Sequence, residues 1–127
     1  MFRLLTCQSF DRLAIAEDED AKAYLVGVRP DESEVGVEGM SDGTCDQLYL
    51  SLRLAHLKRH AAKDGPFPFI VDDILLTFDD KRARAALHCL SDLSQSMQVL
   101  YFTHHRHIRD MAADAEFTGK IWIRDLS

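Results

Sequence analysis

The feature that most constrains the fold is a short apolar run at residues 67–71, which ends in two adjacent aspartates, Asp72 and Asp73. A continuous apolar run of this length is typical of a strand in a parallel sheet covered on both faces. Ligands of open α/β sheets bind beyond the carboxyl ends of the strands, where these two carboxylates lie. One carboxylate can hold Mg²⁺ and the other can orient or deprotonate a water molecule. The alternative is an aspartate pair that only ends a strand and begins a loop.

Alternating helical and strand patterns follow this run. Asp79 or Asp80 can cap a helix in which Ala83, Leu87 and Leu90 keep helical spacing. Residues 99–102 predict a second apolar strand, residues 105–115 a helix, and residues 120–124 a closing strand. This order predicts an α/β fold, with a mostly parallel sheet flanked by helices and joined by right-handed crossovers.

The first part of the chain predicts an antiparallel hairpin followed by a helix. Residues 10–16 and 24–29 are strand-like and flank an acidic turn, and residues 30–38 are polar and turn-like. Residues 46–63 alternate like a strand, but they are strong helix formers and the segment is long for a strand. We therefore expect a helix there, buried on much of its surface, with a capping box made by Thr44 and Gln47.

Size and composition predict one globular domain over residues 1–127. The formal charge of −6 argues against broad DNA binding by this chain alone. Three widely spaced cysteines indicate neither a disulfide framework nor a zinc site, and they favour a reducing, cytoplasmic location. No apolar stretch is long enough to span a membrane.

Two further segments contain groups suited to binding phosphate. A loop at residues 41–44 precedes a helix, where free N–H groups suit a phosphate, although an ordinary capped helix start has the same composition. His104 follows the strand at 99–102, so it is expected at the same sheet edge as Asp72 and can donate a hydrogen bond to a γ-phosphate. His105 and His107 lack the spacing of a helical metal pair, and we expect them to face solvent or to bond locally.

Taken together, these motifs resemble an ABC-type ATPase head of the P-loop NTPase superfamily, in the form found in SMC-like and YhaN-like DNA-repair ATPases. Met40-Ser41-Asp42-Gly43-Thr44 begins a segment, residues 40–55, that resembles the signature motif. Residues 67–73 resemble the Walker B strand, 74–79 the D-loop, and 101–104 the H-loop with its switch histidine. The resemblance covers the chain from about residue 10 onward.

The resemblance implies a role for each matching residue. Asp72 would hold Mg²⁺, Asp73 would take the place of the general base or water-positioning carboxylate, and His104 would contact the γ-phosphate of ATP. Ser41 and Gly43 would bind the γ-phosphate of ATP held by a second head in a homodimer. Asp79 would help to couple the two ATP sites of the dimer.

Three departures qualify the resemblance. The usual base of the family is glutamate, whereas Asp73 is one methylene shorter, and Thr44 stands where many members have Gln or Glu. More important, the chain contains no G-x-x-x-x-G-K-[ST] P-loop, since its Gly119-Lys120 pair lacks the rest of the motif.

The missing P-loop implies the C-terminal half of a head. An N-terminal P-loop half would precede it across a coiled coil, and a nuclease subunit and DNA would be reached through the full-length protein. We expect the isolated chain to be inactive. One alternative is a non-catalytic dimerisation module that keeps the fold. Another is a metal-dependent nuclease using Asp72, Asp73 and His104, with Asp79 and Asp80 as the close further carboxylates.

Overall fold

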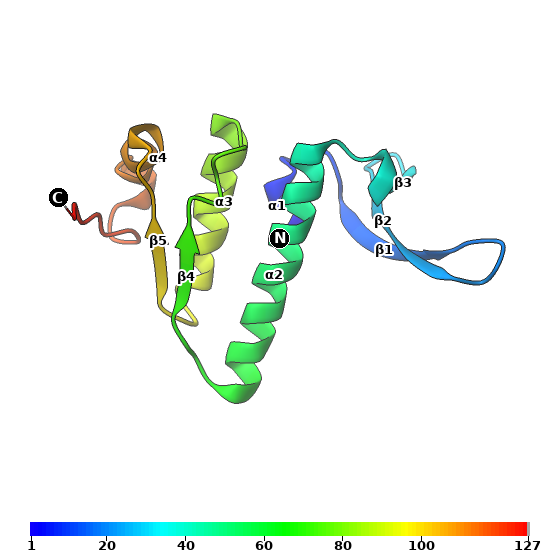
Figure 1. Ribbon diagram of the computed structural model, residues 1–127, viewed down its shortest axis with the longest axis horizontal. Helices are drawn as coiled ribbons and strands as arrows, with labels where there is room; N and C mark the ends of the chain where they lie inside the picture. The colour runs from blue at the N-terminus through cyan, green and yellow to red at the C-terminus, as the bar shows by residue number, and fades with distance from the viewer. Residues whose placement is uncertain (127) are drawn as a thin grey trace. The chain divides into compact units, whose positions relative to one another are not determined.

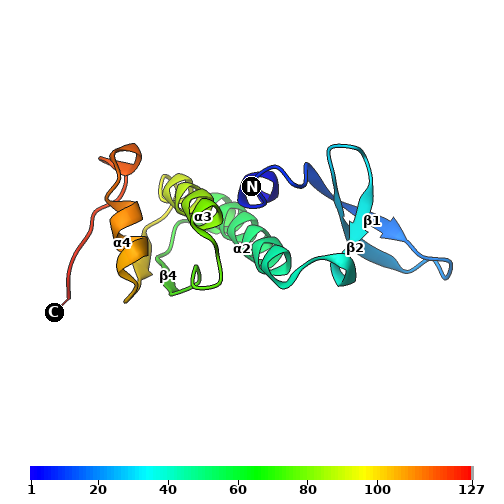
Figure 2. The same cartoon turned by 90° about the horizontal axis from the view of Figure 1, so that it is seen from above.

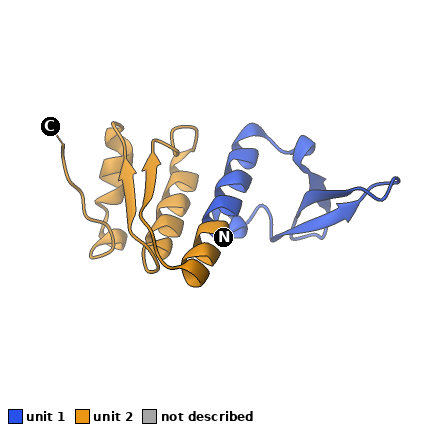
Figure 3. Cartoon of the chain, turned by 60° about the horizontal axis from the view of Figure 1, so that its bottom comes forward, with its two compact units in different colours: residues 1–55 blue, residues 56–127 orange. Residues whose placement is uncertain are grey.

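A computed structural model describes residues 1–126 as two compact units. Unit 1 comprises residues 1–55, and unit 2 begins at His56 (Figure 3). Each unit has its own sheet: a three-stranded antiparallel sheet in unit 1 and a two-stranded parallel sheet in unit 2. The fold is therefore α/β, as predicted, while a single domain over residues 1–127 stays a prediction.

Unit 1 contains the predicted hairpin. Strand β1 (Arg12–Glu17) pairs antiparallel with β2 (Ala23–Val28), in a register that places Arg12 opposite Val28 and Glu17 opposite Ala23. A short helix, α1 (Phe2–Leu5), precedes the hairpin. A third strand, β3 (Glu34–Gly36), pairs with β2 and leads into a 3₁₀ turn at Val37–Gly39. The sequence did not predict β3, because its three residues lie within a polar segment typical of a turn.

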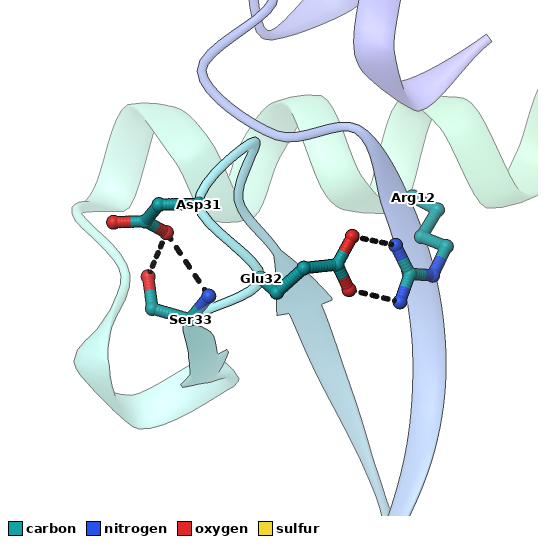
Figure 4. Close-up of polar contacts among 4 residues, drawn as sticks. All are labelled: Arg12, Asp31, Glu32 and Ser33. Atoms are coloured by element: carbon teal, nitrogen blue, oxygen red, sulfur yellow. Dashed lines mark hydrogen bonds and ion pairs between the residues drawn. The ribbon is translucent and has the colours of Figure 1, made fainter.

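Two side-chain contacts stabilise the turn between β2 and β3, one within the turn and one from β1 (Figure 4). The Asp31 carboxylate accepts hydrogen bonds from the backbone N–H of Ser33 at 3.0 Å and from its hydroxyl at 2.6 Å. Arg12, on β1, donates two hydrogen bonds to Glu32 at 3.1 and 2.7 Å. Both residues of this ion pair are exposed, so solvent screens it and we expect it to add little to the free energy of unfolding.

The core of unit 1 joins the sheet to a long helix. Phe2, Phe10 and Leu48 form its buried cluster. A β-carbon at Gly27 would lie 2.7 Å from the Phe10 ring, so only glycine lets that ring lie against β2. The partly buried residues that pack around the cluster come from the strands and the segment after them: Leu13, Leu25, Val35, Val37 and Met40.

The predicted helix is α2 (Asp42–Asp64), and it begins four residues earlier than expected. Ser41, rather than Thr44, caps it: the Ser41 hydroxyl accepts a hydrogen bond from the Thr44 N–H at 3.3 Å. The expectation of burial over much of its surface was wrong, because only one face is buried and Tyr49 and Leu52 are exposed. The buried residues follow helical spacing: Gln47, Leu48, Leu50, Ser51, Leu54 and Ala61. Among residues 1–126, no helix combines the length and apolar character needed to cross a membrane.

Unit 2 contains the predicted parallel pair. Strands β4 (Phe69–Asp72) and β5 (Val99–Phe102) run parallel, with Asp72 in register with Phe102. Helix α3 (Asp80–Leu93) connects them and packs against β5 and α4 (Arg106–Ala112), as Figures 1 and 2 show. The predicted strand–helix–strand–helix order is confirmed up to α4.

The predicted closing strand at residues 120–124 was wrong. This segment pairs with no strand of the described chain and instead borders a groove of about 670 Å³ beside β5. A strand needs a neighbouring strand edge as well as a period of two, and only the period can be read from the sequence. The expected mostly parallel sheet is therefore limited to β4 and β5, while the antiparallel sheet has three strands.

One face of the parallel pair is open to solvent within unit 2. Side chains alternate across a strand, so Ile70 lies on the same face as its register partner Leu100 and as Phe102. Ile70 is 64% exposed and Phe102 is 43% exposed, whereas Val71, on the opposite face, is buried. Exposed apolar side chains beside an unpaired strand edge favour association.

We therefore expect the isolated chain to self-associate. Replacing Ile70 with lysine should reduce the apparent mass measured by light scattering, because a charge on this face opposes its burial. The matched control is Ile15→Lys, since Ile15 is also exposed but lies on β1 in unit 1. A native chain that stays monomeric across a wide concentration range would contradict this expectation.

Candidate functional site

The carboxyl ends of β4 and β5 bring two separate sequence motifs together. Asp72 is the last residue of β4, and Asp73 follows it directly. The backbone N–H of Asp73 donates to the carbonyl of Phe102, the last residue of β5, at 3.0 Å. This bond extends the strand pairing by one residue, so Thr103 and His104 leave β5 next to Asp73.

Asp73 adopts a backbone conformation that few residues accept. Its φ is +46°, in the left-handed region, where aspartate and asparagine are several-fold enriched among non-glycine residues. Aspartate tolerates this region because its short side chain can hydrogen-bond to the neighbouring backbone, whereas the longer glutamate side chain is less suited to that contact. The conformation therefore favours aspartate over a longer carboxylate at this position.

His104 and Asp73 are in direct contact. Nδ1 of His104 lies 2.6 Å from Oδ2 of Asp73. A carboxylate can only accept a hydrogen bond, so Nδ1 must carry the proton in this contact. A ring that also donates through Nε2 must then carry both protons. The His104 side chain is 78% exposed, which leaves its outer edge accessible to a ligand.

The surroundings of Asp73 favour its ionised form. A hydrogen bond from the Thr103 hydroxyl lowers the pKa of Asp73 most, and the nearby His104 and His105 lower it further. Partial burial acts in the opposite direction but does not prevail. The site therefore holds a carboxylate, which can accept a proton or bind a cation, rather than a carboxylic acid.

His105 lies in the site, which the sequence did not predict. Its Nε2 is 3.8 Å from Oδ2 of Asp73, and its ring centroid lies 4.0 Å from that of His104. His105 is half-buried rather than solvent-facing, and its backbone N–H bonds locally to the Thr103 hydroxyl at 3.1 Å. Spacing within the histidine run could not indicate the approach to Asp73, because Asp73 follows a different strand, β4.

The other two predicted residues of unit 2 have different surroundings. Asp72 is exposed and makes no ion pair with any residue in 1–126. Asp79 caps α3, since its carboxylate accepts a hydrogen bond from the backbone N–H of Arg82 at 2.9 Å. Asp80 is the first residue of that helix. The capping predicted for this position is confirmed, and a coupling role for Asp79 stays a prediction.

Ser41 and Gly43 belong to unit 1. The carbonyl of Ser41 accepts from the Cys45 N–H at 2.9 Å, and its hydroxyl lies 2.9 Å from that of Thr44. Gly43 lies in the first turn of α2. The loop is thus a capped helix start, and a role of Ser41 and Gly43 in binding phosphate stays a prediction.

Comparison with known proteins adds one similarity. No protein-family profile matches the chain. Over 110 residues, 86% of its length, the chain is 36% identical to a Bacillus subtilis (strain 168) protein described as uncharacterized protein YhaN. The aligned part covers 11% of YhaN, so the chain corresponds to a small segment of that relative.

Proposed function

We propose that this chain is the C-terminal lobe of an SMC-like ABC-type ATPase head, which binds and hydrolyses ATP with Mg²⁺ when two heads associate. The 2.6 Å contact between Asp73 and His104 carries the proposal. It joins the carboxylate that follows the Walker B-like strand to the histidine that follows the H-loop-like strand. The similarity to a segment of YhaN supports the subfamily, although YhaN is itself uncharacterized.

In this proposal Asp73 orients the attacking water and accepts its proton. Its lowered pKa keeps it ionised and ready to accept a hydrogen bond from water. The exposed edge of His104 donates to the γ-phosphate while Nδ1 remains hydrogen-bonded to Asp73. The two side chains then act on opposite partners of one reaction, the water and the phosphate.

Asp72 is the residue suited to Mg²⁺. Its carboxylate is exposed and is not engaged in an ion pair within residues 1–126, so it remains available to a hydrated cation. Mg²⁺ in such sites neutralises charge on the phosphate oxygens. The P-loop that cradles those phosphates would come from an N-terminal half, and Ser41 and Gly43 would serve ATP on the second head.

We expect the 127-residue chain alone to show negligible ATP turnover, because it has no P-loop backbone or lysine to hold the β- and γ-phosphates. Supplying a polypeptide with the P-loop half should restore turnover, measured as phosphate release. Turnover by the purified chain alone that is abolished by Asp73→Ala would contradict the need for a second half.

The coding sequence upstream of Met1 tests the same proposal independently. A P-loop and heptad repeats fused before this segment would support an ATPase head. A genuine start site after a stop codon would instead favour a non-catalytic dimerisation module. Roles in DNA double-strand-break repair or chromosome maintenance, with a nuclease subunit and DNA as partners, belong to the whole protein and rest on this outcome.

A further inference from the structure

We propose that Asp73, His104 and His105 form a binding site for a divalent transition-metal ion, with Zn²⁺ as the best match. Each residue offers one ligand atom: a carboxylate oxygen, Nδ1 of His104 and Nε2 of His105. These three atoms lie within 4.8 Å of one another. No other group of three such side chains within residues 1–126 meets this geometry.

The separations suit a single ion. Ligands bound at about 2.1 Å in tetrahedral geometry lie about 3.4 Å apart. Oδ2 of Asp73 lies 2.6 Å from Nδ1 of His104 and 3.8 Å from Nε2 of His105, which bracket that value. His104 is largely exposed, so a small outward movement of its ring would let an ion enter between the three atoms.

The donor set selects a transition metal over Mg²⁺. Two imidazole nitrogens and one carboxylate oxygen suit zinc, iron, nickel or copper, whereas Mg²⁺ and Ca²⁺ prefer oxygen ligands alone. Three protein ligands leave a fourth position for water, as in open zinc sites. This site is therefore distinct in chemistry from the Mg²⁺ position proposed for Asp72.

Unsatisfied polar atoms point to the same ligand. Nε2 of His105 and Oδ1 of Asp73 are buried, and neither makes a hydrogen bond of normal geometry within the described chain. Buried polar atoms without a partner are unfavourable, because they have lost their hydrogen bonds to water. A bound cation would give Nε2 a partner and would complete the charge around the carboxylate.

Neighbouring groups hold the ligands in place. The Thr103 hydroxyl oxygen accepts a hydrogen bond from the backbone N–H of His105 at 3.1 Å, which holds the first residue after His104 against the end of β5. The backbone N–H of Asp73 is itself held, because it donates to the Phe102 carbonyl at 3.0 Å. Supporting contacts of this kind orient metal ligands and are worth about 10- to 100-fold in affinity.

Metal binding would use two groups that the proposed hydrolysis also needs. An ion held by Asp73 and His104 would prevent the first from accepting a proton and the second from reaching phosphate. The metal-bound form would then be catalytically silent. Binding itself requires only side chains of unit 2 and does not depend on the proposed function.

The test is a titration of the untagged, nucleotide-free 127-residue chain with Co²⁺, followed by displacement with Zn²⁺. Helix α2 carries a second histidine pair, His56 and His60, which can bind metal adventitiously. The titration is therefore made in a His60→Asn background. We expect one equivalent of Co²⁺ with visible d–d bands, and loss of these bands as Zn²⁺ binds.

Single variants assign the ligands. His104→Asn, His105→Asn and Asp73→Asn should each weaken Co²⁺ binding by at least about 100-fold, since each removes a direct ligand. Asparagine at position 73 tolerates the left-handed backbone, and circular dichroism would verify folding of each variant. His107→Asn is the matched control, because the His107 ring lies beside that of His105, with centroids 5.6 Å apart, but is outside the ligand set.

The outcomes separate this proposal from the proposed function. Unchanged affinity in His105→Asn and Asp73→Asn, or binding that disappears in the His60→Asn background, would overturn the metal site and leave the ATPase proposal intact. One equivalent that depends on all three ligands would support the metal site even if no ATPase activity is ever reconstituted.

Discussion

Replacing Asp73 with asparagine in the assembled head is expected to lower ATP turnover by about 100- to 10,000-fold, with nucleotide binding retained. Asparagine preserves the size of the side chain and accepts the left-handed backbone, but it cannot accept a proton from water at neutral pH. Turnover would be measured by phosphate release and binding by equilibrium titration, both on the chain combined with its P-loop half.

Two further variants test whether the loss of turnover is specific to the carboxylate of Asp73. Asp80→Asn removes a carboxylate from the first turn of α3 without touching the strand ends, and it should leave turnover close to that of the native head. Asp73→Glu tests the role of the backbone, because glutamate keeps a carboxylate but is disfavoured at a φ of +46°. Native turnover in Asp73→Asn would remove Asp73 from the mechanism.

Phe117→Ala is expected to be the most destabilising single change in unit 2. Phe117 is 1% exposed and is among the largest fully buried side chains, and its ring lies 4.6 Å from that of His88 on α3. Truncating a buried phenylalanine costs about 3–5 kcal/mol, because the site loses apolar contact and keeps a cavity. Thermal unfolding followed by circular dichroism should show a fall in Tm of more than about 10 °C.

The matched comparison is Phe102→Ala, which makes the same chemical change at a side chain that is 43% exposed. We expect less than half the loss seen for Phe117→Ala, since less apolar surface leaves the protein interior. Equal losses in the two variants would show that the segment after α4 does not pack as described. Ion pairs from Arg84 to Asp114 and Glu116 also tie this segment to α3, but they are partly exposed and secondary to the burial of Phe117.

A metal ion and ATP would engage the Asp73–His104 pair in different ways. His104 and Asp73 are in direct contact, with Nδ1 of His104 2.6 Å from Oδ2 of Asp73. An ion would separate them slightly, whereas a nucleotide would engage only the outer edge of His104. Zn²⁺ that binds the chain should therefore inhibit turnover in the assembled head, and His105→Asn should relieve that inhibition while keeping both catalytic groups.

Local chemistry explains which elements could be predicted. The hairpin, α2, β4, α3 and β5 follow from periodicity, helix-forming composition and turn residues, all of which act over a few neighbouring positions. The missed strand β3 has three residues, too few to show a period. The predicted strand at 120–124 shows the opposite error, because its alternation is real but it pairs with no strand within residues 1–126.

The sequence by itself determined that acidic and histidine residues follow two successive parallel strands, and therefore that Asp72, Asp73 and His104 share one sheet edge. Only the tertiary structure decided which of these groups touch. The register of β4 against β5 brings Asp73 to His104 and to the unpredicted His105, and Asp73 itself has a left-handed backbone. Contacts between residues about thirty positions apart depend on strand register, which has no signature in residue spacing.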